Sequence, residues 1–357
     1  MIGKVKIIFF TTITIILVIF GVLIKNVKIT SSLSLSTFPA SSSNIITGPR
    51  FGSTVYLGDL NNNIYTFDSL SDFNLAQYKL TDGGITSMVI VGTLIYCTHK
   101  SKNYVSCIYR DRAKKITVGS NPCACVYDGI DFVWTADRLS NTISCISIEG
   151  SKFKQSYEIG WEPIDIAYNS EDIIVCLKKD KQLAIFNITN NRVSYRITVG
   201  NDTNYPIKMC CDSEKVVWVL GSLDIFQLVD IANKKVLKTI NISKLLTRSP
   251  PFYGIDGGGL YCSNQGNPIP KSTPIGIVTN FVDVFIGDTS YNPAVHIYNK
   301  STLSYIYSVC IVGYPYLSSI FVDNFYLYTF ASGNSKKFSV FNFNTKKQVI
   351  EYQFPNE

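Results

Sequence analysis

Short runs of apolar and β-branched residues recur along most of the chain, and turn-forming residues separate them. One such stretch, Phe132–Ile146, begins as an apolar strand around Trp134 and passes through the polar tip Asp137–Asn141. It then continues as an alternating strand from Thr142. Two short β-type runs joined by a polar tip are typical of an antiparallel hairpin. The pattern therefore predicts an all-β protein.

The hairpin at Trp134 is one copy of a repeat with a period near forty residues. A Gly-containing junction followed by Pro precedes it at Val118–Pro122 and returns at Ile159–Pro163, Val199–Pro206 and Val312–Pro315. A fixed period with β-type residues between turn signals indicates a stacked or radial repeat. In such a repeat, we expect Trp134 to pack between neighbouring units.

Each repeat is predicted to form a four-stranded antiparallel blade. A blade with two apolar faces cannot bury them alone, so blades must pack face to face around an axis. The template predicts a seven-bladed β-propeller. Its blades lie at about residues 53–80, 81–118, 119–159, 160–199, 200–243, 244–312 and 313–354. Their second strands are centred on Val55, Ile95, Val133, Ile174, Val217, Leu260 and Tyr326.

The sixth and first repeats depart from this template. The sixth is too long for one blade, and its excess is assigned to an insertion near residues 265–290. An alternative makes Val284–Ile286 a strand of an eighth, degenerate blade. The first repeat lacks an inner strand, which residues 44–51 can supply to close the ring.

The first 28 residues form a separate segment. Ile7–Ile24 is an uncharged run that, as a helix with a rise of about 1.5 Å per residue, crosses the hydrocarbon core of a bilayer. The run ends in Val22-Leu23-Ile24 instead of a small-residue cleavage site, so we expect an uncleaved transmembrane anchor over 1–28. The alternative is a cleaved signal peptide and a secreted domain.

The charges around this segment favour an amino terminus on the cytoplasmic side. Two lysines flank the run on each side, and the amino terminus adds a further positive charge in front of it. A Ser-rich stalk over 29–52 and a propeller domain over 53–357 are then extracytoplasmic. The four flanking lysines supply four of the seven net positive charges of the chain, and the remainder lacks the excess of a nucleic-acid-binding domain.

The repeat resembles the YVTN-type β-propeller repeats, which are related to the WD40-like and quinoprotein-dehydrogenase-like propellers. The resemblance rests on the order V-G-x-x-P, D-G, an aliphatic-aromatic strand and S-N-T, and it is clearest over residues 118–148. It covers roughly residues 53–354. The chain departs from it at Ala136, Leu177 and Leu220, where the repeats have Asn. The resemblance implies a fold and leaves the chemistry open, since this group includes surface-binding proteins, lactonases and cofactor-dependent dehydrogenases.

Candidate catalytic residues are few. His99 and His296 are the two histidines, they fall in different predicted blades, and we expect both to be packed or surface imidazoles. The sequence has no haem-attachment, nucleophile-elbow or phosphate-loop motif, and we expect no cofactor and no metal site. The favoured function is a binding or scaffold module for a protein or glycan partner. The alternative is an extracytoplasmic enzyme, a lactonase-like hydrolase or an oxidoreductase, that uses carboxylates such as Glu162.

The predicted binding surface lies at the mouth of the ring, where the loops between blades meet. A group of Asn, Asp, Glu and aromatic side chains at this place can bind a polar molecule or a peptide end. The candidates are Asn121, Trp161, Glu162, Asp202, Asn204 and Tyr314.

The chain contains ten cysteines and no C-x-x-C pair. Several occupy equivalent positions of the repeat, which fits small buried apolar residues. Cys97 and Cys107 are expected opposite each other on adjacent strands of one hairpin, at a distance that a disulfide can bridge. In an oxidising compartment we therefore expect a disulfide between them.

Four sequons for N-linked glycosylation occur in the chain. They are usable if the domain is lumenal and the host glycosylates. The asparagines are Asn187, Asn201, Asn241 and Asn299.

Overall fold

The computed structural model describes most of the chain from residue 45 to residue 354. The described residues are 45–51, 54–59, 63–68, 76–79, 83–110, 112–213, 215–242, 252–254, 274–289, 293–311, 316–323, 325–332 and 336–354. They belong to one compact unit, Ser41–Asn356. Within them, no helix is long and apolar enough to span a bilayer. The predicted anchor and residues 29–44 of the stalk lie outside the described residues.

The described strands form seven sheets. Sheet one contains β1 (Ile45–Phe51), β2 (Thr54–Asp59), β3 (Asn63–Asp68) and β4 (Ala76–Lys79). Sheet two contains β5 (Ile85–Val91), β6 (Leu94–His99), β7 (Tyr104–Tyr109) and β8 (Arg112–Thr117). Sheet three contains β9 (Pro122–Tyr127), β10 (Phe132–Asp137), β11 (Thr142–Ser147) and β12 (Lys152–Glu158). Sheet four contains β13 (Pro163–Tyr168), β14 (Asp172–Leu177), β15 (Gln182–Asn187) and β16 (Arg192–Thr198).

The remaining three sheets continue the same order. Sheet five contains β17 (Pro206–Ser213), β18 (Val216–Gly221), β19 (Ile225–Asp230) and β20 (Lys235–Asn241). Sheet six contains β21 (Phe252–Gly254), β22 (Pro274–Thr279), β23 (Asp283–Asp288), β24 (Ala294–Asn299) and β25 (Tyr305–Cys310). Sheet seven contains β26 (Tyr316–Val322), β27 (Tyr326–Ser332), β28 (Lys336–Asn342) and β29 (Lys347–Phe354). All pairs are antiparallel between successive strands, except that β21 pairs parallel with β25.

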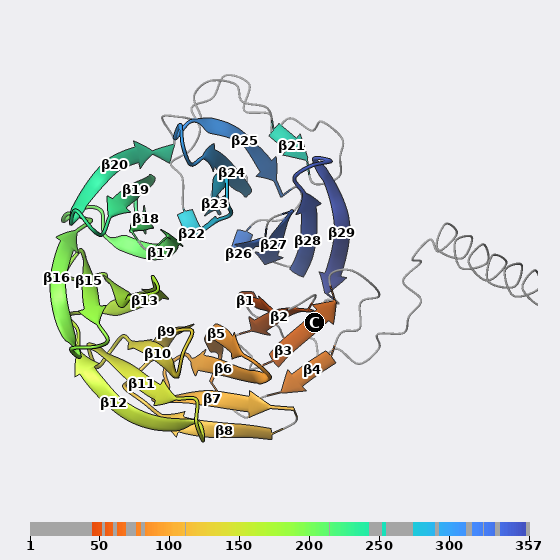
Figure 1. Ribbon diagram of the computed structural model, residues 1–357. Coiled ribbons are helices and arrows are strands. Elements are labelled where there is room, and N and C mark those ends of the chain that lie inside the picture. The colour runs from red at the N-terminus through yellow and green to blue at the C-terminus, as the bar shows by residue number, and fades with distance from the viewer. Residues whose placement is uncertain are drawn as a thin grey trace, which may run out of the picture. The chain divides into compact units, whose positions relative to one another are not determined.

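The sheets follow one another around a closed ring (Figure 1). The antiparallel first strands β1, β5, β9, β13, β17, β22 and β26 lie side by side in this order, and β26 also contacts β1. The first strands therefore line the inside of the ring, and the last strands lie toward its outer edge, with β21 outside β25 in sheet six (Figure 1). The prediction of an all-β chain built from repeated four-stranded antiparallel sheets is confirmed. Residues 45–51, at the end of the predicted stalk, form the first strand of sheet one.

The turn between the first and second strands holds an Asp or Asn whose side chain closes the hairpin. In four sheets its Oδ1 atom accepts two or three backbone N–H bonds at 2.7–3.1 Å. These local bonds satisfy the turn without help from another sheet. The residues are Asp128, Asn169, Asn280 and Asp323.

The choice between Asp and Asn follows the third residue of the second strand. The indole of Trp134 donates to Asp128 Oδ2 at 3.2 Å, because a carboxylate has a second oxygen to accept with. An amide has no second acceptor, and Asn stands where the strand presents no donor. The donor pairs are Trp134 with Asp128, Trp218 with Asp212 and Tyr328 with Asp323, whereas Ile174 follows Asn169 and Phe285 follows Asn280.

Aromatic side chains of the second strands pack between neighbouring sheets. The ring of Trp134 lies 5.6 Å from the ring of Phe186 in sheet four, and both belong to one buried cluster. Phe285 of sheet six lies 5.0 Å from Phe343, which follows β28 of sheet seven. The apolar faces that one sheet cannot bury are thus covered by the next, as the repeat predicts.

In the sixth repeat the strands differ from the predicted assignment. Its second strand is β23, which contains Val284–Ile286 and pairs with β22 and β24 of one sheet. Val284–Ile286 is therefore part of sheet six and not of an additional sheet, and Leu260 lies outside the described residues. The first strand begins at Pro274, and Asn280 follows it by six residues, the same spacing as in sheets three to five. Pro250 and Asp256 stand six residues apart as well, and this earlier copy of the spacing is the reason that the repeat predicts the second strand at Leu260.

Candidate functional site

The connections between sheets form the end of the ring that we call the loop face. They comprise the segment before each first strand and the turn between the second and third strands. In sheets three, four and five a backbone bond joins the two: Arg138 N–H donates to Asn121 O, Lys178 N–H to Glu162 O and Ser222 N–H to Tyr205 O, at 2.8–3.1 Å. Asn121, Glu162 and Tyr205 hold equivalent positions, each directly before the Pro of a first strand. The backbone hydrogen bond is therefore the same at these three positions, whereas the side chain differs.

Two aromatic side chains of the loop face are exposed beside lysines. Trp161 is 56% exposed, and Lys179 Nζ lies 4.3 Å from its ring centroid. Tyr205 is exposed in the next connection, with Lys178 Nζ 4.7 Å from its ring centroid. A cation over an aromatic face orients the ring and leaves its other face open. We refer to the group of Arg138, Trp161, Glu162, Lys178, Lys179 and Tyr205 as the loop-face patch.

Glu162 is the carboxylate of this patch and lies between two cations. Arg138 donates to its Oε1 through Nε, at 3.0 Å, and through Nη2, while Lys178 Nζ lies 3.7 Å from the same oxygen. Glu162 has a φ of +58°, a conformation that side chains other than Asn and Asp rarely adopt. Asn121 occupies the equivalent position with a φ of +56°. The backbone conformation and the ion pairs with Arg138 and Lys178 together fix the Glu162 carboxylate at the loop face.

The other predicted binding residues have different roles. Asn204 is 5% exposed, and its Oδ1 accepts the backbone N–H of Leu223 at 3.0 Å, so it supports the loop from inside. Asn121 is half-buried and accepts the backbone N–H of Ser101 at 3.0 Å. Asp202 is exposed and paired with Lys181, whose hydrogen bond lowers the pKa of its carboxyl. Tyr314 lies outside the described residues.

Sequence reasoning missed four members of the patch, namely Arg138, Lys178, Lys179 and Tyr205. Arg138 begins the turn after β10 and meets Glu162 only because sheets three and four adjoin. Lys178 begins the turn after β14, in the same sheet as Glu162, and the hairpin brings the two together. Tyr205 could have been found, because it stands directly before Pro206 as Glu162 stands before Pro163.

Both histidines are buried and hydrogen-bonded. His99 lies 2.7 Å from Gly83 O and 2.8 Å from Ser106 Oγ. His296 Nδ1 lies 2.7 Å from Ser308 Oγ, and its Nε2 lies 3.2 Å from Asp288 Oδ2. The second cluster has the residue types of a hydrolase triad, but Ser308 is fully buried, so no substrate carbonyl can reach its hydroxyl. These side chains satisfy one another inside sheets two and six.

Sheet three also contains a buried polar cluster, which is centred on the carboxyl group of Asp137. Asp137 accepts hydrogen bonds from Ser144 Oγ at 2.5 Å, Thr135 Oγ1 at 2.8 Å and Gly119 N–H at 3.2 Å. Burial raises its pKa from 3.8 to about 6, and these bonds lower it only in part. The cluster ties the start of the sheet to its second and third strands.

The predicted disulfide between Cys97 and Cys107 does not form, and both residues are free thiols. The strand register pairs Tyr96 with Cys107 and Cys97 with Ser106. Cys97 and Cys107 are thus one position out of register, which turns their side chains to opposite faces of the sheet. Burial raises the pKa of the Cys97 thiol well above its usual value. Cys310 is disulfide-bonded.

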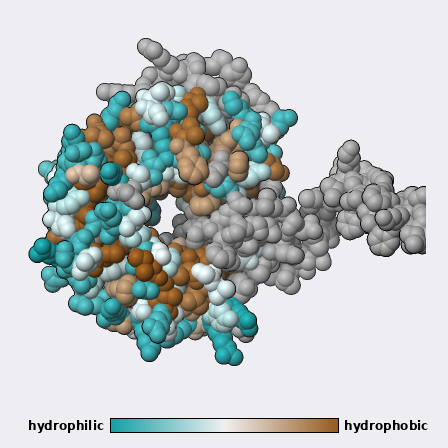
Figure 2. Space-filling view, in the orientation of Figure 1, coloured by the Kyte–Doolittle hydropathy of each residue, from teal (hydrophilic) through white to brown (hydrophobic). Residues whose placement is uncertain are grey.

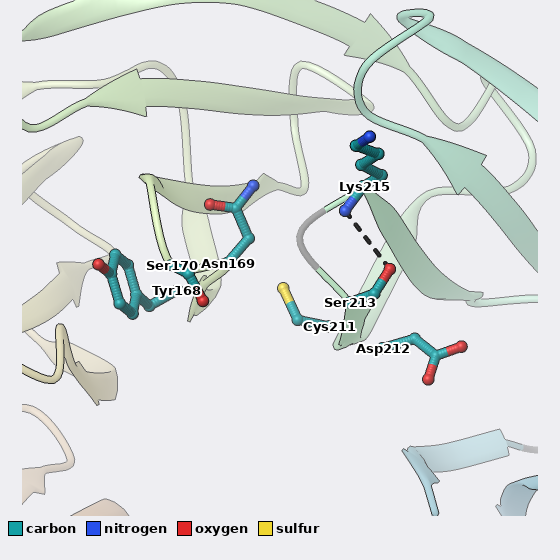
Figure 3. Close-up of a pocket in the computed structure, with 7 residues that line it drawn as sticks. All are labelled: Tyr168, Asn169, Ser170, Cys211, Asp212, Ser213 and Lys215. Atoms are coloured by element: carbon teal, nitrogen blue, oxygen red, sulfur yellow. Dashed lines mark hydrogen bonds between the residues drawn. The ribbon is translucent and has the colours of Figure 1, made fainter. Parts of the chain in front are cut away.

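A hollow lies at the end of the ring opposite the loop face, between the turns that join the first and second strands of sheets four and five (Figure 3). It has a volume of about 490 Å³ and is lined by Tyr168, Asn169, Ser170, Cys211, Asp212, Ser213 and Lys215. Asn169 and Asp212 already bind their own hairpins, and Asp212 is also paired with Lys300. Burial raises the pKa of the Cys211 thiol, which disfavours the reactive thiolate. In this hollow and in the rest of the described chain, no three His, Cys, Asp or Glu side chains are arranged to hold a metal ion.

The sequon asparagines differ in accessibility. Asn201 is exposed in the loop before β17, and Thr203 Oγ1 of the same sequon donates to its Oδ1 at 2.9 Å. Asn187 donates through Nδ2 to Asp172 at 2.9 Å, so its reactive nitrogen is engaged. Asn241 and Asn299 are half-buried. Asn201 is therefore the sequon best placed for modification.

Comparison with known proteins gives a likeness of fold. No family model matches this chain, and no curated protein matches it by sequence. Among solved structures, the crystal structure of the computationally designed Ika8 protein is similar, with a TM-score of 0.59 and 12% sequence identity over 88% of each chain. At this identity the similarity concerns the fold alone.

Proposed function

We propose that the chain is a membrane-anchored, extracytoplasmic recognition module whose loop-face patch binds a protein partner. Its ring is a seven-bladed β-propeller of the YVTN type, with each sheet as one blade. The observation that carries the proposal is the exposed Trp161, whose ring lies under Lys179. The next residue, Glu162, pairs with Arg138 and with Lys178, and Lys178 also lies over the Tyr205 ring. The backbone bonds beneath these side chains fix the patch before binding, which lowers the entropy cost of association.

The composition of the patch favours a protein partner over a glycan. Trp, Tyr and Arg dominate the energetic centres of protein interfaces, because they combine large contact areas with hydrogen-bonding groups. Trp161, Tyr205 and Arg138 supply these types from three successive sheets. Leu139 and Leu223 are exposed on the same face, in the turns of sheets three and five on either side of sheet four, and can extend the apolar contact.

The extracytoplasmic assignment rests on the predicted anchor and on Cys310. Stable disulfides form in oxidising compartments and are rare in the cytosol. The bond at Cys310 supports an extracytoplasmic domain. Peptide mapping of the native protein without reductant tests this, with Cys310 expected in a disulfide and Cys97 and Cys107 expected as free thiols.

Proximity labelling from the full-length chain in its native membrane tests the proposal. A labelling enzyme at the carboxyl terminus should mark extracytoplasmic neighbours, including one protein whose labelling depends on the patch. We expect the double variant Trp161→Ala/Tyr205→Ala to lose this protein. The matched control Phe281→Ala/Phe325→Ala removes two exposed aromatics from the opposite end and should retain it.

Two results would contradict the proposal. Labelling of cytosolic proteins alone would overturn the orientation. Equal loss of the labelled protein in the patch variant and in the control variant would show that the loop-face patch has no specific role.

A further inference from the structure

The outer edge of the ring carries charge of one sign along four successive sheets. Strand β8 contains three Lys or Arg residues, and β12, β16 and β20 contain two each, all of them exposed. Glu158 is the single acidic residue in these four strands. We call these nine cations the basic rim. The last strands β4, β25 and β29 of the other three sheets contain two lysines and one glutamate together, and β21, which pairs outside β25, contains no charged residue.

The four strands follow one another along the edge of the ring (Figure 1). Strand β8 contacts β12, and β16 contacts β20. In the same orientation, Figure 2 shows mostly hydrophilic residues along this edge. A row of like charges this long raises the local concentration of a polyanion and favours a ligand that is itself extended. The rim therefore suits a chain-like anion better than a small one.

A groove between β8 and β12 lies within the basic rim. It has a volume of about 530 Å³, and Lys114, Lys115 and Lys152 lie among its lining residues. Phe153 also lines it and is 46% exposed. Lys114 Nζ donates to Gly150 O at 2.8 Å, which positions one ammonium group at the groove. The rest of the lining is mixed, with Ile116, Val118 and Gly119 beside the hydroxyl-bearing Thr117, Ser140, Thr142, Ser151 and Ser156.

These groups match the chemistry of an acidic sugar chain. The ammonium groups can pair with sulfates or carboxylates, the exposed Thr117 hydroxyl can exchange hydrogen bonds with sugar hydroxyls, and Phe153 offers a ring for the apolar face of a sugar. Single-stranded nucleic acid binds instead by stacking successive bases on several aromatic side chains along a basic groove. Phe153 is the one aromatic side chain that lines this groove in the described structure. We propose that the basic rim binds a linear sulfated or carboxylated polysaccharide, seated in the β8–β12 groove.

Binding of a heparin-derived octasaccharide to the full-length chain in detergent micelles tests this proposal. If about four cations make contact, the affinity should fall roughly 100-fold between 50 and 200 mM salt, because each contact releases counterions. The variant Lys114→Gln/Lys152→Gln should weaken binding about tenfold. It should also reduce the slope of log affinity against log salt by about two.

A matched variant controls for the loss of two charges. Lys215→Gln/Lys347→Gln removes two exposed lysines from other parts of the ring and should bind the octasaccharide as the unmodified chain does. Both variants should unfold at the same temperature as the parent, since all four side chains are exposed. Equal weakening by both variants, or no weakening by the groove variant, would overturn the proposal.

A single-stranded oligonucleotide of the same net charge distinguishes sugar recognition from a general affinity for polyanions. We expect it to bind at least tenfold more weakly than the octasaccharide. If it binds as tightly and is weakened equally by Lys114→Gln/Lys152→Gln, the polysaccharide assignment is wrong. Neither result depends on the loop-face patch, so this proposal can fail while the proposed protein-binding function stands.

Discussion

Sheets three and six share one hairpin design but differ in one atom of the turn residue. Asp128 closes the first turn of sheet three and uses its second oxygen to accept the Trp134 indole N–H. Asn280 closes the same turn in sheet six, where Phe285 replaces Trp134 and has nothing to donate. The turn residue is therefore matched to its packing partner within each sheet. The comparison teaches that the repeat conserves bonds and packing more strictly than residue identity.

Removal of the aromatic side chain that packs against the next sheet should have the largest effect on stability, and the loss should be similar in both sheets. Trp134→Ala and Phe285→Ala each remove a buried aromatic ring that packs against the next sheet. We expect each to lower the free energy of unfolding by about 3–5 kcal/mol. Chemical denaturation measures both. A loss below about 1 kcal/mol for Phe285→Ala alone would show that sheet six does not use the shared design.

The end of the second strand in sheet three should give stability a dependence on pH. Asp137 of sheet three lies among hydroxyls with a pKa of about 6, whereas Asp288 of sheet six lies beside His296. In the unfolded chain the pKa of Asp137 is about 3.9, so between pH 4 and 6 the folded state holds a proton that the unfolded state has lost. This contribution to stability is present below pH 4 and is lost as the pH rises to about 6. It amounts to roughly 3 kcal/mol.

Asp137→Asn is the variant that isolates this contribution. Relative to the parent, its free energy of unfolding should rise between pH 4 and pH 6 and stay level above. Denaturant unfolding at several pH values measures the difference. A constant difference between parent and variant across this range would show that Asp137 does not titrate with a raised pKa.

The match between turn residue and packing partner should appear as a coupling energy. Asp128→Asn leaves the buried Trp134 N–H facing an amide donor or without a partner, and we expect a loss of about 1–2 kcal/mol. In a Trp134→Phe background, which copies sheet six, the same change should cost less than about 0.5 kcal/mol. A double-mutant cycle measures this coupling. Additive effects would mean that the pairing of Asp with Trp is incidental.

The smallest expected effect on stability concerns the exposed tryptophan. Trp161→Ala should change the free energy of unfolding by less than about 0.5 kcal/mol, because the side chain is more than half exposed. The contrast with Trp134→Ala distinguishes buried residues that stabilise the packing between sheets from exposed residues that are available to a partner. A loss near 3 kcal/mol for Trp161→Ala would place Trp161 in the first class.

Much of the fold could be predicted because its signals are local. The Pro that begins a first strand, the turn residue six positions later and the Ser-Asn tip all lie within one repeat, as in residues 122–141. Sheet six was assigned wrongly because Pro250 and Asp256 copy these signals before the true first strand at Pro274. The prediction of a Cys97–Cys107 disulfide was wrong because the actual strand register differs by one residue from the predicted one. A shift of one residue turns a side chain to the other face of the sheet.

The candidate site could be predicted only in part, because its groups come from different sheets. Trp161 and Glu162 were found by their place before Pro163. Arg138 lies 24 residues from Glu162 in sequence, and no local pattern shows that the two meet. The basic rim could not be predicted for the same reason. Its lysines and arginines are dispersed along the sequence, and only the ring brings them to one edge.

Site-specific photo-cross-linking tests most directly whether the loop face is the recognition surface. A photo-reactive amino acid at Leu139 borders the loop-face patch and leaves Trp161 and Tyr205 intact, whereas one at Phe281 lies on the opposite end. Leu139 is 67% exposed and Phe281 is 84% exposed, so both are accessible. We predict that the full-length chain in its native membrane cross-links to one discrete protein from position 139 and not from position 281. Cross-linking of a protein from position 281 alone would contradict the account.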